Sequence, residues 1–125
     1  MYRIGTDLVE IKRIEKSVQN DRFNRRVYSQ DELTLFSSKK KPFESMAGNW
    51  AGKEAFSKAL GTGVVGFSLN EVEILRDELN APFIRLSGHA KKIADELKLG
   101  FSISITHTET LAQAVVIAWK KEENK

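Results

Sequence analysis

The chain has 125 residues, of which 41% are hydrophobic and 30% charged, a composition typical of a soluble globular protein. Lys and Arg number 20 against 17 Asp and Glu, so the net charge is +3 and the chain suits an acidic or phosphorylated partner. The sequence contains no cysteine, which excludes disulfides, thiolate zinc sites and a cysteine nucleophile.

The length predicts one domain, residues 1–125, because a chain of this size can bury a single core without staples. The chain has no run of about 18 apolar residues, so we expect no membrane partner. The N-terminal segment MYRIGTDLVEI carries acidic residues where a signal peptide needs an apolar core. We therefore expect a cytoplasmic location, with a frayed tail at about 121–125.

The first half of the chain is expected to form a strand and then helices. Met1 to Leu8 alternates as a strand does and brings Asp7 to its end. From about Val9 the apolar spacing becomes helical, and this first helix has a basic side. Ser29 and Glu32 form a capping-box pattern before a short second helix. Pro42 suits the first turn of a long helix, expected from about 43 to 60.

The second half is expected to be mostly β-structure. Residues 67–76 read as a strand, and 83–86 pair back with it as a hairpin. Ser87 is expected to cap a helix that Gly100 closes. The alternating segment 101–106 reads as a half-buried strand that delivers His107 to its end, and 111–119 reads as a central strand, apolar on both faces. We expect an α+β fold, with helices against a mostly antiparallel sheet.

The long helix carries the first candidate site. Glu54 and Lys58 are four residues apart, so both head groups leave the same face. Such a pair is also an ordinary surface contact, which stabilises an exposed helix by roughly 0.2–0.5 kcal/mol. Ala47, Ala51, Ala55 and Ala59 form a stripe of small residues that lets another backbone approach.

Three further features could contribute to chemistry, and each has a structural alternative. Asp7 suits a metal ligand or a helix cap. Gly61 and Gly63 suit a ligand-binding loop or a simple helix stop. His107 suits a ligand contact or a hydrogen-bonded structural role. Two carboxylates without histidine or thiolate neighbours would suit Mg²⁺, which prefers oxygen ligands and keeps several waters.

The motifs together resemble one family, the small trimeric holo-acyl-carrier-protein synthases, which are 4′-phosphopantetheinyl transferases. The resemblance rests on three segments, in family order and across essentially the whole chain: GTDLVEIKRI (5–14), WAGKEAFSKALGTG (50–63) and SISITHT (102–108). It implies the 4′-phosphopantetheinyl transferase fold. The implied reaction transfers the 4′-phosphopantetheine arm of coenzyme A to a serine of apo acyl carrier protein and releases adenosine 3′,5′-bisphosphate, in support of fatty acid biosynthesis.

The resemblance also implies roles for individual residues. Asp7, Glu54 and Lys58 are the catalytic candidates: Asp7 and Glu54 would hold Mg²⁺, and Glu54 or a metal-bound water would take the serine proton. Five residues would contact coenzyme A: Lys53, Lys58, Gly61, Gly63 and His107. Arg13 is the first choice for contact with the acidic carrier protein, followed by Arg22, Arg25 and Arg26. The active site would lie between adjacent subunits of a homotrimer.

Two positions depart from the family pattern. The family usually has an arginine where this chain has Asn49, so a coenzyme phosphate contact is expected to be missing or supplied from elsewhere. The predicted hairpin turn, residues 79–82, lacks the glycine that usually precedes the proline.

Two other functions remain open from the residues alone. The basic cluster at residues 22–26 would suit a nucleic-acid-binding module, but the interleaved aromatic residues of such modules are missing, so we expect no nucleic-acid partner. A transferase-like protein that has lost activity and only binds a carrier is the third possibility, which Asn49 keeps open. Coenzyme binding with and without Mg²⁺ distinguishes it from an active enzyme.

Overall fold

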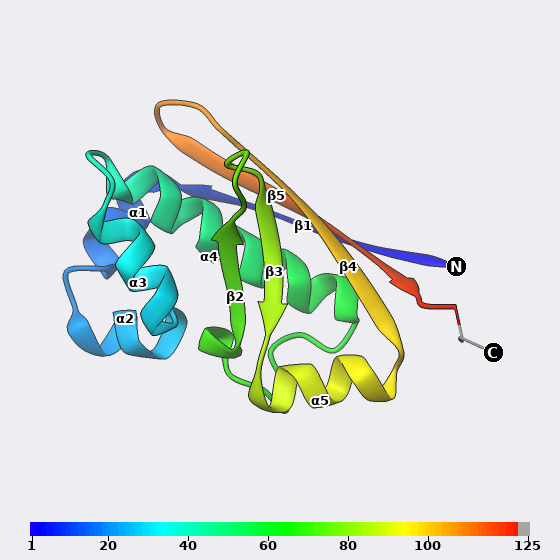
Figure 1. Ribbon diagram of the computed structural model, residues 1–125. Helices are drawn as coiled ribbons and strands as arrows, with labels where there is room; N and C mark the ends of the chain where they lie inside the picture. The colour runs from blue at the N-terminus through cyan, green and yellow to red at the C-terminus, as the bar shows by residue number, and fades with distance from the viewer. Residues whose placement is uncertain (123–125) are drawn as a thin grey trace.

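The computed structural model describes residues 1–122 and has the expected α+β architecture (Figure 1). Its central element is the long helix α4 (Pro42–Leu60), which begins with proline in its first turn as predicted. One side of α4 packs against a three-stranded antiparallel sheet, and a two-stranded hairpin crosses another side. The α4 helix thus provides most of the buried surface on which the rest of the chain is arranged.

The larger sheet has the strand order β1-β5-β4, formed by β1 (Tyr2–Glu10), β5 (Leu111–Lys120) and β4 (Leu99–His107). The central place of β5 was predicted from its apolar character on both faces. Asp7 pairs with Ala114, and His107 pairs with Ala112, so these two polar residues lie on opposite edge strands. The expected tail at about 121–125 lies partly outside the described residues.

The smaller sheet is the predicted hairpin, formed by β2 (Val72–Arg76) and β3 (Pro82–Leu86). The expected strand from residue 67 is wrong in its first part, because β2 begins only at Val72. Ser68 and Glu71 form a capping box that winds the preceding residues into the 3₁₀ turn η1 (Leu69–Glu71). The turn of the hairpin contains Asn80 with a φ of 64°, a left-handed conformation that asparagine tolerates better than most residues.

Four shorter helices surround α4: α1 (Ile11–Ser17), α2 (Asp21–Val27), α3 (Gln30–Ser37) and α5 (Gly88–Glu96). The Ser29–Glu32 capping box begins α3 as predicted. Helix α2 was not predicted from its polar composition, and the Asn20 side chain caps it by accepting two backbone N–H groups. Helix α5 ends before Gly100, which lies in β4, where an added Cβ would be 3.0 Å from the Trp119 ring.

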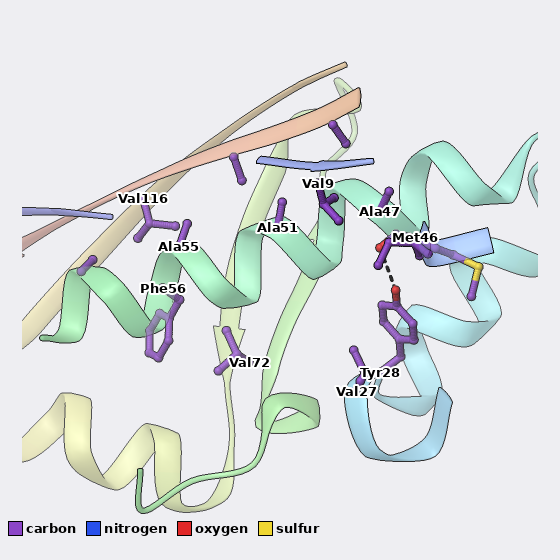
Figure 2. Close-up of a cluster of buried hydrophobic side chains, with 14 of the residues drawn as sticks. Val9, Val27, Tyr28, Met46, Ala47, Ala51, Ala55, Phe56, Val72 and Val116 are labelled. Atoms are coloured by element: carbon purple, nitrogen blue, oxygen red, sulfur yellow. Dashed lines mark hydrogen bonds between the residues drawn. The ribbon is translucent and has the colours of Figure 1, made fainter. Parts of the chain in front are cut away.

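The alanine stripe of α4 has the packing role expected of it. All four alanines are at most 1% exposed, and they face β1 and β5 in the main core (Figure 2). At the tightest point, a Cβ added to Gly5 would lie 1.9 Å from the Ala55 carbonyl oxygen. The strand can therefore contact the helix backbone only with glycine at this position.

The opposite face of β1 is apolar and exposed. Tyr2, Ile4 and Leu8 are 74%, 66% and 59% exposed, and Ile4 pairs across the sheet with Ile117, itself 38% exposed. A contiguous apolar face of this kind typically marks an interaction surface. Within residues 1–122, no helix is long and apolar enough to cross a membrane.

Candidate active site

The structure brings Asp7 of β1 and Lys58 of α4 together, although 51 positions separate them in the chain. The Lys58 ammonium donates to the Asp7 carboxylate at 3.2 Å and to the Thr6 carbonyl at 3.0 Å. The Lys58 side chain is 55% exposed, so its charge remains accessible to an anion from solvent. The predicted association of Asp7 with the face of α4 that carries Lys58 is therefore present within one chain.

Glu54 is the second carboxylate of this site. Burial, followed by the negative charge of Asp7, raises the pKa of Glu54 above its ordinary value. The positive charges of Lys58 and Arg13 oppose this rise. Glu54 is therefore close to three charged groups, Asp7, Lys58 and Arg13, and its raised pKa makes its carboxylate a better proton acceptor than an ordinary exposed glutamate.

The two carboxylates, Asp7 and Glu54, decide which kind of metal ion this site could bind. Among the described residues there is no group of three or more His, Asp or Glu side chains arranged to bind a metal. Asp7 and Glu54 would supply two oxygen ligands only, which leaves other positions for water and substrate oxygens. That donor set fits Mg²⁺, which is commonly held by one or two carboxylates together with water and phosphate.

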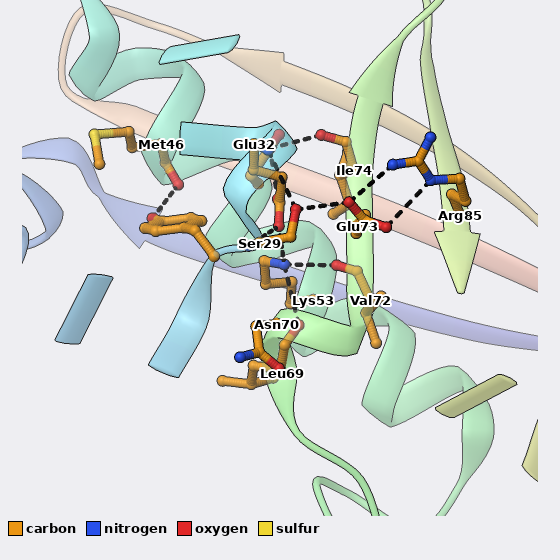
Figure 3. Close-up of polar contacts among 12 residues, drawn as sticks. Ser29, Glu32, Met46, Lys53, Leu69, Asn70, Val72, Glu73, Ile74 and Arg85 are labelled. Carbon is orange, nitrogen blue, oxygen red and sulfur yellow. Dashed lines mark hydrogen bonds and ion pairs between the residues drawn. The ribbon is translucent and has the colours of Figure 1, made fainter. Parts of the chain in front are cut away.

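Lys53 does not belong to this site, and the expectation that it contacts a coenzyme needs correction (Figure 3). Its ammonium is fully buried and donates to the Glu32 carboxylate at 2.6 Å and to the Leu69 and Val72 carbonyls. An ammonium has three protons, and these three oxygens use all of them. Burial lowers the pKa of Lys53 and raises the pKa of Glu32, and their mutual attraction opposes both shifts.

Asn49 lies one helical turn from Lys53 and joins the same buried network. Its amide nitrogen donates to the Glu32 carboxylate at 2.9 Å and to the Ile74 carbonyl at 2.8 Å. Its amide oxygen accepts a hydrogen bond of 3.0 Å from the Arg76 guanidinium. Both ends of the fully buried amide are therefore occupied.

His107 lies in a different place, at the rim of a cavity of about 530 Å³. Its Nε2 is 3.6 Å from the Glu44 carboxylate, in the first turn of α4. The cavity is also lined by Arg76 and by the loop that precedes α4, whose three consecutive lysines are residues 39–41. This "lysine pocket" therefore gathers four positively charged side chains and the single carboxylate of Glu44.

The lysine pocket and the carboxylate site are well separated within one chain. His107 contacts Glu44 near the start of α4, whereas Asp7 contacts Lys58 near its end. Fourteen positions of helix separate Glu44 from Lys58, which is about 21 Å along the axis at 1.5 Å per residue. The structure thus brings together Asp7, Glu54 and Lys58, but it does not bring His107 to them.

The two glycines after α4 differ in their roles. Gly61 ends the helix in the left-handed conformation, with a φ of 90°, so the helix-stop interpretation is confirmed for it. Gly63 has a φ of 67°, and a Cβ added there would meet no atom within 4 Å. Gly63 is therefore open to solvent, and its expected contact with a ligand stays a prediction.

The arginines of α2 border a third feature, a cavity of about 540 Å³ that we call the arginine pocket. Arg22, Arg25 and Arg26 line it together with apolar side chains, which include Phe23, Val64, Phe67 and Trp50. The rings of Phe23 and Trp50 are 5.6 Å apart. Trp50 is four residues before Glu54, so the arginine pocket and the Glu54 carboxylate lie along the same face of α4.

Sequence reasoning missed the residues that form these two pockets. The run Lys39–Lys41 was visible only as a short basic loop, and Arg76 had the appearance of a hairpin residue. Trp50 was considered as the first residue of the segment WAGKEAFSKALGTG and not as a pocket residue. The one available signal was the charge run directly before Pro42, because a helix N-terminus next to basic residues favours anions.

One protein family and many known proteins are similar to this chain. A family model described as the 4′-phosphopantetheinyl transferase superfamily matches residues 3–116. A holo-[acyl-carrier-protein] synthase from Thermoanaerobacter sp. (strain X514) is 42% identical over 123 residues, which is 97% of this chain and 89% of the relative.

Solved structures of similar proteins have the same fold. A holo-[acyl-carrier-protein] synthase from Neisseria meningitidis superposes with a TM-score of 0.88 at 34% identity, and the match covers 94% of this chain and 98% of that one. A holo-[acyl-carrier-protein] synthase from Helicobacter pylori, solved in complex with coenzyme A, gives a TM-score of 0.81 at 38% identity and covers 93% and 99% of the two chains.

Proposed function

This chain belongs to the 4′-phosphopantetheinyl transferase superfamily, and we propose that it is a holo-acyl-carrier-protein synthase that moves the phosphopantetheine arm of coenzyme A to a serine of apo acyl carrier protein. Adenosine 3′,5′-bisphosphate is the other product, and the modified carrier serves fatty acid biosynthesis. The observation that carries this proposal is the meeting of Asp7, Glu54 and Lys58 at the β1–α4 contact. Residues 1–125 would constitute one transferase domain.

The residues of the carboxylate site have distinct roles in this reaction. Lys58 is exposed enough to bind a phosphate oxygen of the coenzyme while it stays in contact with Asp7. Glu54, whose pKa is raised by burial and by Asp7, accepts the proton of the incoming serine directly or through water. Asp7 and Glu54 would hold Mg²⁺, which when bound stabilises negative charge around the attacked phosphorus.

The lysine pocket is the proposed site for the nucleotide portion of the coenzyme. It is lined by the cations of residues 39–41, by Arg76 and by His107, and it lies beside the first turn of α4. A helix N-terminus with surrounding cations favours phosphate. Since this pocket is remote from Glu54 within one chain, the nucleotide portion and the carboxylates would come from two subunits.

The exposed sheet face supports a homotrimer with active sites between subunits. Tyr2, Ile4 and Leu8 present apolar side chains to solvent along one side of β1, and association with another copy would remove this surface from water. In a threefold ring the interface is heterologous, so β1 of one subunit would contact a different surface of its neighbour. This arrangement would bring His107 of one subunit toward Asp7 of another.

The arginine pocket is the proposed docking site for the acidic carrier protein. Arg22 and Arg25 line its rim, its interior is aromatic and aliphatic, and Arg13 lies near Glu54 at the adjoining site. A charged rim around an apolar centre raises the association rate with an oppositely charged partner and makes this rate sensitive to salt. The pocket lies on the Glu54 face of α4, so a docked carrier would have its serine near the proposed proton acceptor.

A mass-shift assay tests the proposed function. The protein is incubated with coenzyme A, Mg²⁺ and an apo acyl carrier protein, and the carrier should gain the mass of one phosphopantetheine arm. Omission of Mg²⁺ should abolish the gain. If several apo carriers gain no mass while the protein still binds coenzyme A, the active-enzyme proposal fails and the binding-only alternative remains. The cytoplasmic location stays a prediction.

A further inference from the structure

Two arginines of the β2–β3 hairpin have different electrostatic surroundings. Arg85 donates to the carboxylates of Glu73 and Asp31, which neutralise its charge. Arg76 donates instead to two neutral oxygens, the Asn49 amide and the Leu75 carbonyl. Its guanidinium therefore keeps its positive charge uncompensated by direct contacts, at the wall of the lysine pocket.

Asn49 has only one way to orient its amide. The two hydrogens of its nitrogen are used by Glu32 and by the Ile74 carbonyl, so its oxygen must point toward Arg76. The amide is fully buried, and Glu32 is itself held by Lys53 and by the backbone of Ser29. A rigid interior network thus fixes the direction of a partly exposed guanidinium.

This preorganisation distinguishes Arg76 from the other cations of the lysine pocket. Residues 39–41 lie in the loop before α4, and they are compact ammonium charges on flexible stems. A guanidinium has five N–H donors in a planar fork that matches a phosphate group, and two of these donors are already directed by protein oxygens. Since little side-chain freedom remains to be lost on binding, Arg76 can contribute selectivity.

We propose that Arg76 is a specificity-determining residue of the lysine pocket, which recognises a phosphomonoester on the nucleotide of the coenzyme, and that Asn49 is the positioning residue that directs it. This inference rests on the proposed function for the identity of the substrate. It also accounts for Asn49 at a position where the sequence resemblance leads one to expect arginine. The missing positive charge is supplied from β2, and the asparagine holds it in place.

The test compares coenzyme A with dephospho-coenzyme A, which lacks the phosphomonoester. We expect Arg76→Gln to lower kcat/KM for coenzyme A by about 10- to 100-fold, mainly through KM, because a charge-assisted hydrogen bond is lost. The same variant should leave kcat/KM for dephospho-coenzyme A within about threefold of wild type. Arg76→Lys should be intermediate, since it keeps the charge and loses the planar fork.

Arg85→Gln is the matched control, because Arg85 lies on the same hairpin and its charge is already neutralised. We expect Arg85→Gln to leave unchanged the ratio of kcat/KM for coenzyme A to kcat/KM for dephospho-coenzyme A. Asn49→Ala should lower kcat/KM for coenzyme A selectively, as Arg76→Gln does. The double variant should show no larger loss of kcat/KM than either single variant. If Asn49→Ala does not fold, Asn49→Ser carries the same expectation, because it is too short to reach Arg76.

A direct binding measurement separates this inference from the proposed function. Titration calorimetry should show that Arg76→Gln weakens the binding of adenosine 3′,5′-bisphosphate and leaves the binding of adenosine 5′-monophosphate unchanged. Equal losses for both nucleotides, or no loss for either, would overturn the role of Arg76. If the wild-type protein transfers nothing from coenzyme A, the proposed function is overturned. The nucleotide-binding measurement still decides the role of Arg76, because it does not depend on transfer.

Discussion

Gly5 of β1 and Ala55 of α4 meet backbone to backbone, and a Cβ on Gly5 would lie 1.9 Å from the Ala55 carbonyl oxygen and 2.6 Å from the Ala59 nitrogen. This contact joins the strand that carries Asp7 to the helix that carries Glu54 and Lys58. The spacing between strand and helix therefore decides whether the carboxylates and the lysine reach one another.

We predict that Gly5→Ala destabilises the protein by about 3 kcal/mol or more, because neither backbone can move away from the added methyl without disturbing the core. Urea unfolding followed by circular dichroism measures this change. Gly63→Ala is the control: its methyl meets open space, so only the positive φ opposes it, at about 1 kcal/mol. Equal losses for the two variants would contradict this account of the strand–helix contact.

Lys53→Met tests the structural role assigned to the buried lysine. Removal of one partner from a buried ion pair leaves the Glu32 carboxylate without compensation, so we expect a loss of about 3–5 kcal/mol in unfolding free energy. The loss should be larger at pH 8 than at pH 5, because an unpaired buried carboxyl has a raised pKa and its ionisation opposes folding.

Lys58→Met is the matched variant on the same helix. Its ion pair with Asp7 is exposed, so we expect less than about 1 kcal/mol of destabilisation but a clear loss of transfer activity. Lys53→Met, in contrast, should bind coenzyme A normally. At a temperature where the Lys53→Met variant is folded, the KM of this variant for coenzyme A should equal that of wild type. A raised KM with unchanged stability would restore Lys53 to the coenzyme site.

Glu54→Gln should separate activity from stability. We expect transfer to fall by about 10²-fold or more, because a proton acceptor and a metal ligand are both lost, while the chain still folds. The raised pKa of Glu54 means that the folded protein binds its proton more tightly than the unfolded chain does. The wild type therefore loses stability as pH rises through the interval between the unfolded value of about 4.3 and the folded value.

Glu54→Gln should consequently be more stable than wild type at pH 7, and this difference should disappear below about pH 4, where Glu54 is protonated in both states. Thermal unfolding across this pH range measures it. Parallel stability curves for the two proteins would show that burial and Asp7 do not perturb Glu54. An active Glu54→Gln enzyme would remove Glu54 from the mechanism.

Mixed oligomers test whether sites are shared between subunits. Asp7→Asn and His107→Ala should each abolish or strongly reduce transfer when assayed alone. Coexpression of the two variants should restore about a quarter of wild-type activity, because random assembly leaves that share of sites with both native residues. Native mass spectrometry establishes the oligomeric state and the mixing. Mixed oligomers without any recovered activity would show that His107 and Asp7 do not act at one shared site.

The elements that carry the motifs could be predicted because their signals are local. Pro42 and Gly61 bound the long helix, and the period-two alternation around Ile103 and Ile105 identified β4. Helix α2 and the late start of β2 were missed because capping by Asn20 and by Ser68 outweighed the polar or alternating pattern. Local hydrogen bonds of this kind compete with periodicity over a few residues.

The family of this protein, its long helix and the candidate residues Asp7, Glu54 and Lys58 could be recognised from the amino-acid sequence, because motifs and residue spacing are local properties of the chain. The roles of the two lysines were decided only by the tertiary structure. Lys53 and Lys58 are five positions apart, so they point about 140° away from each other around α4. Glu32 of α3 meets one side and Asp7 of β1 meets the other, and these distant partners make the first lysine structural and leave the second in the candidate site.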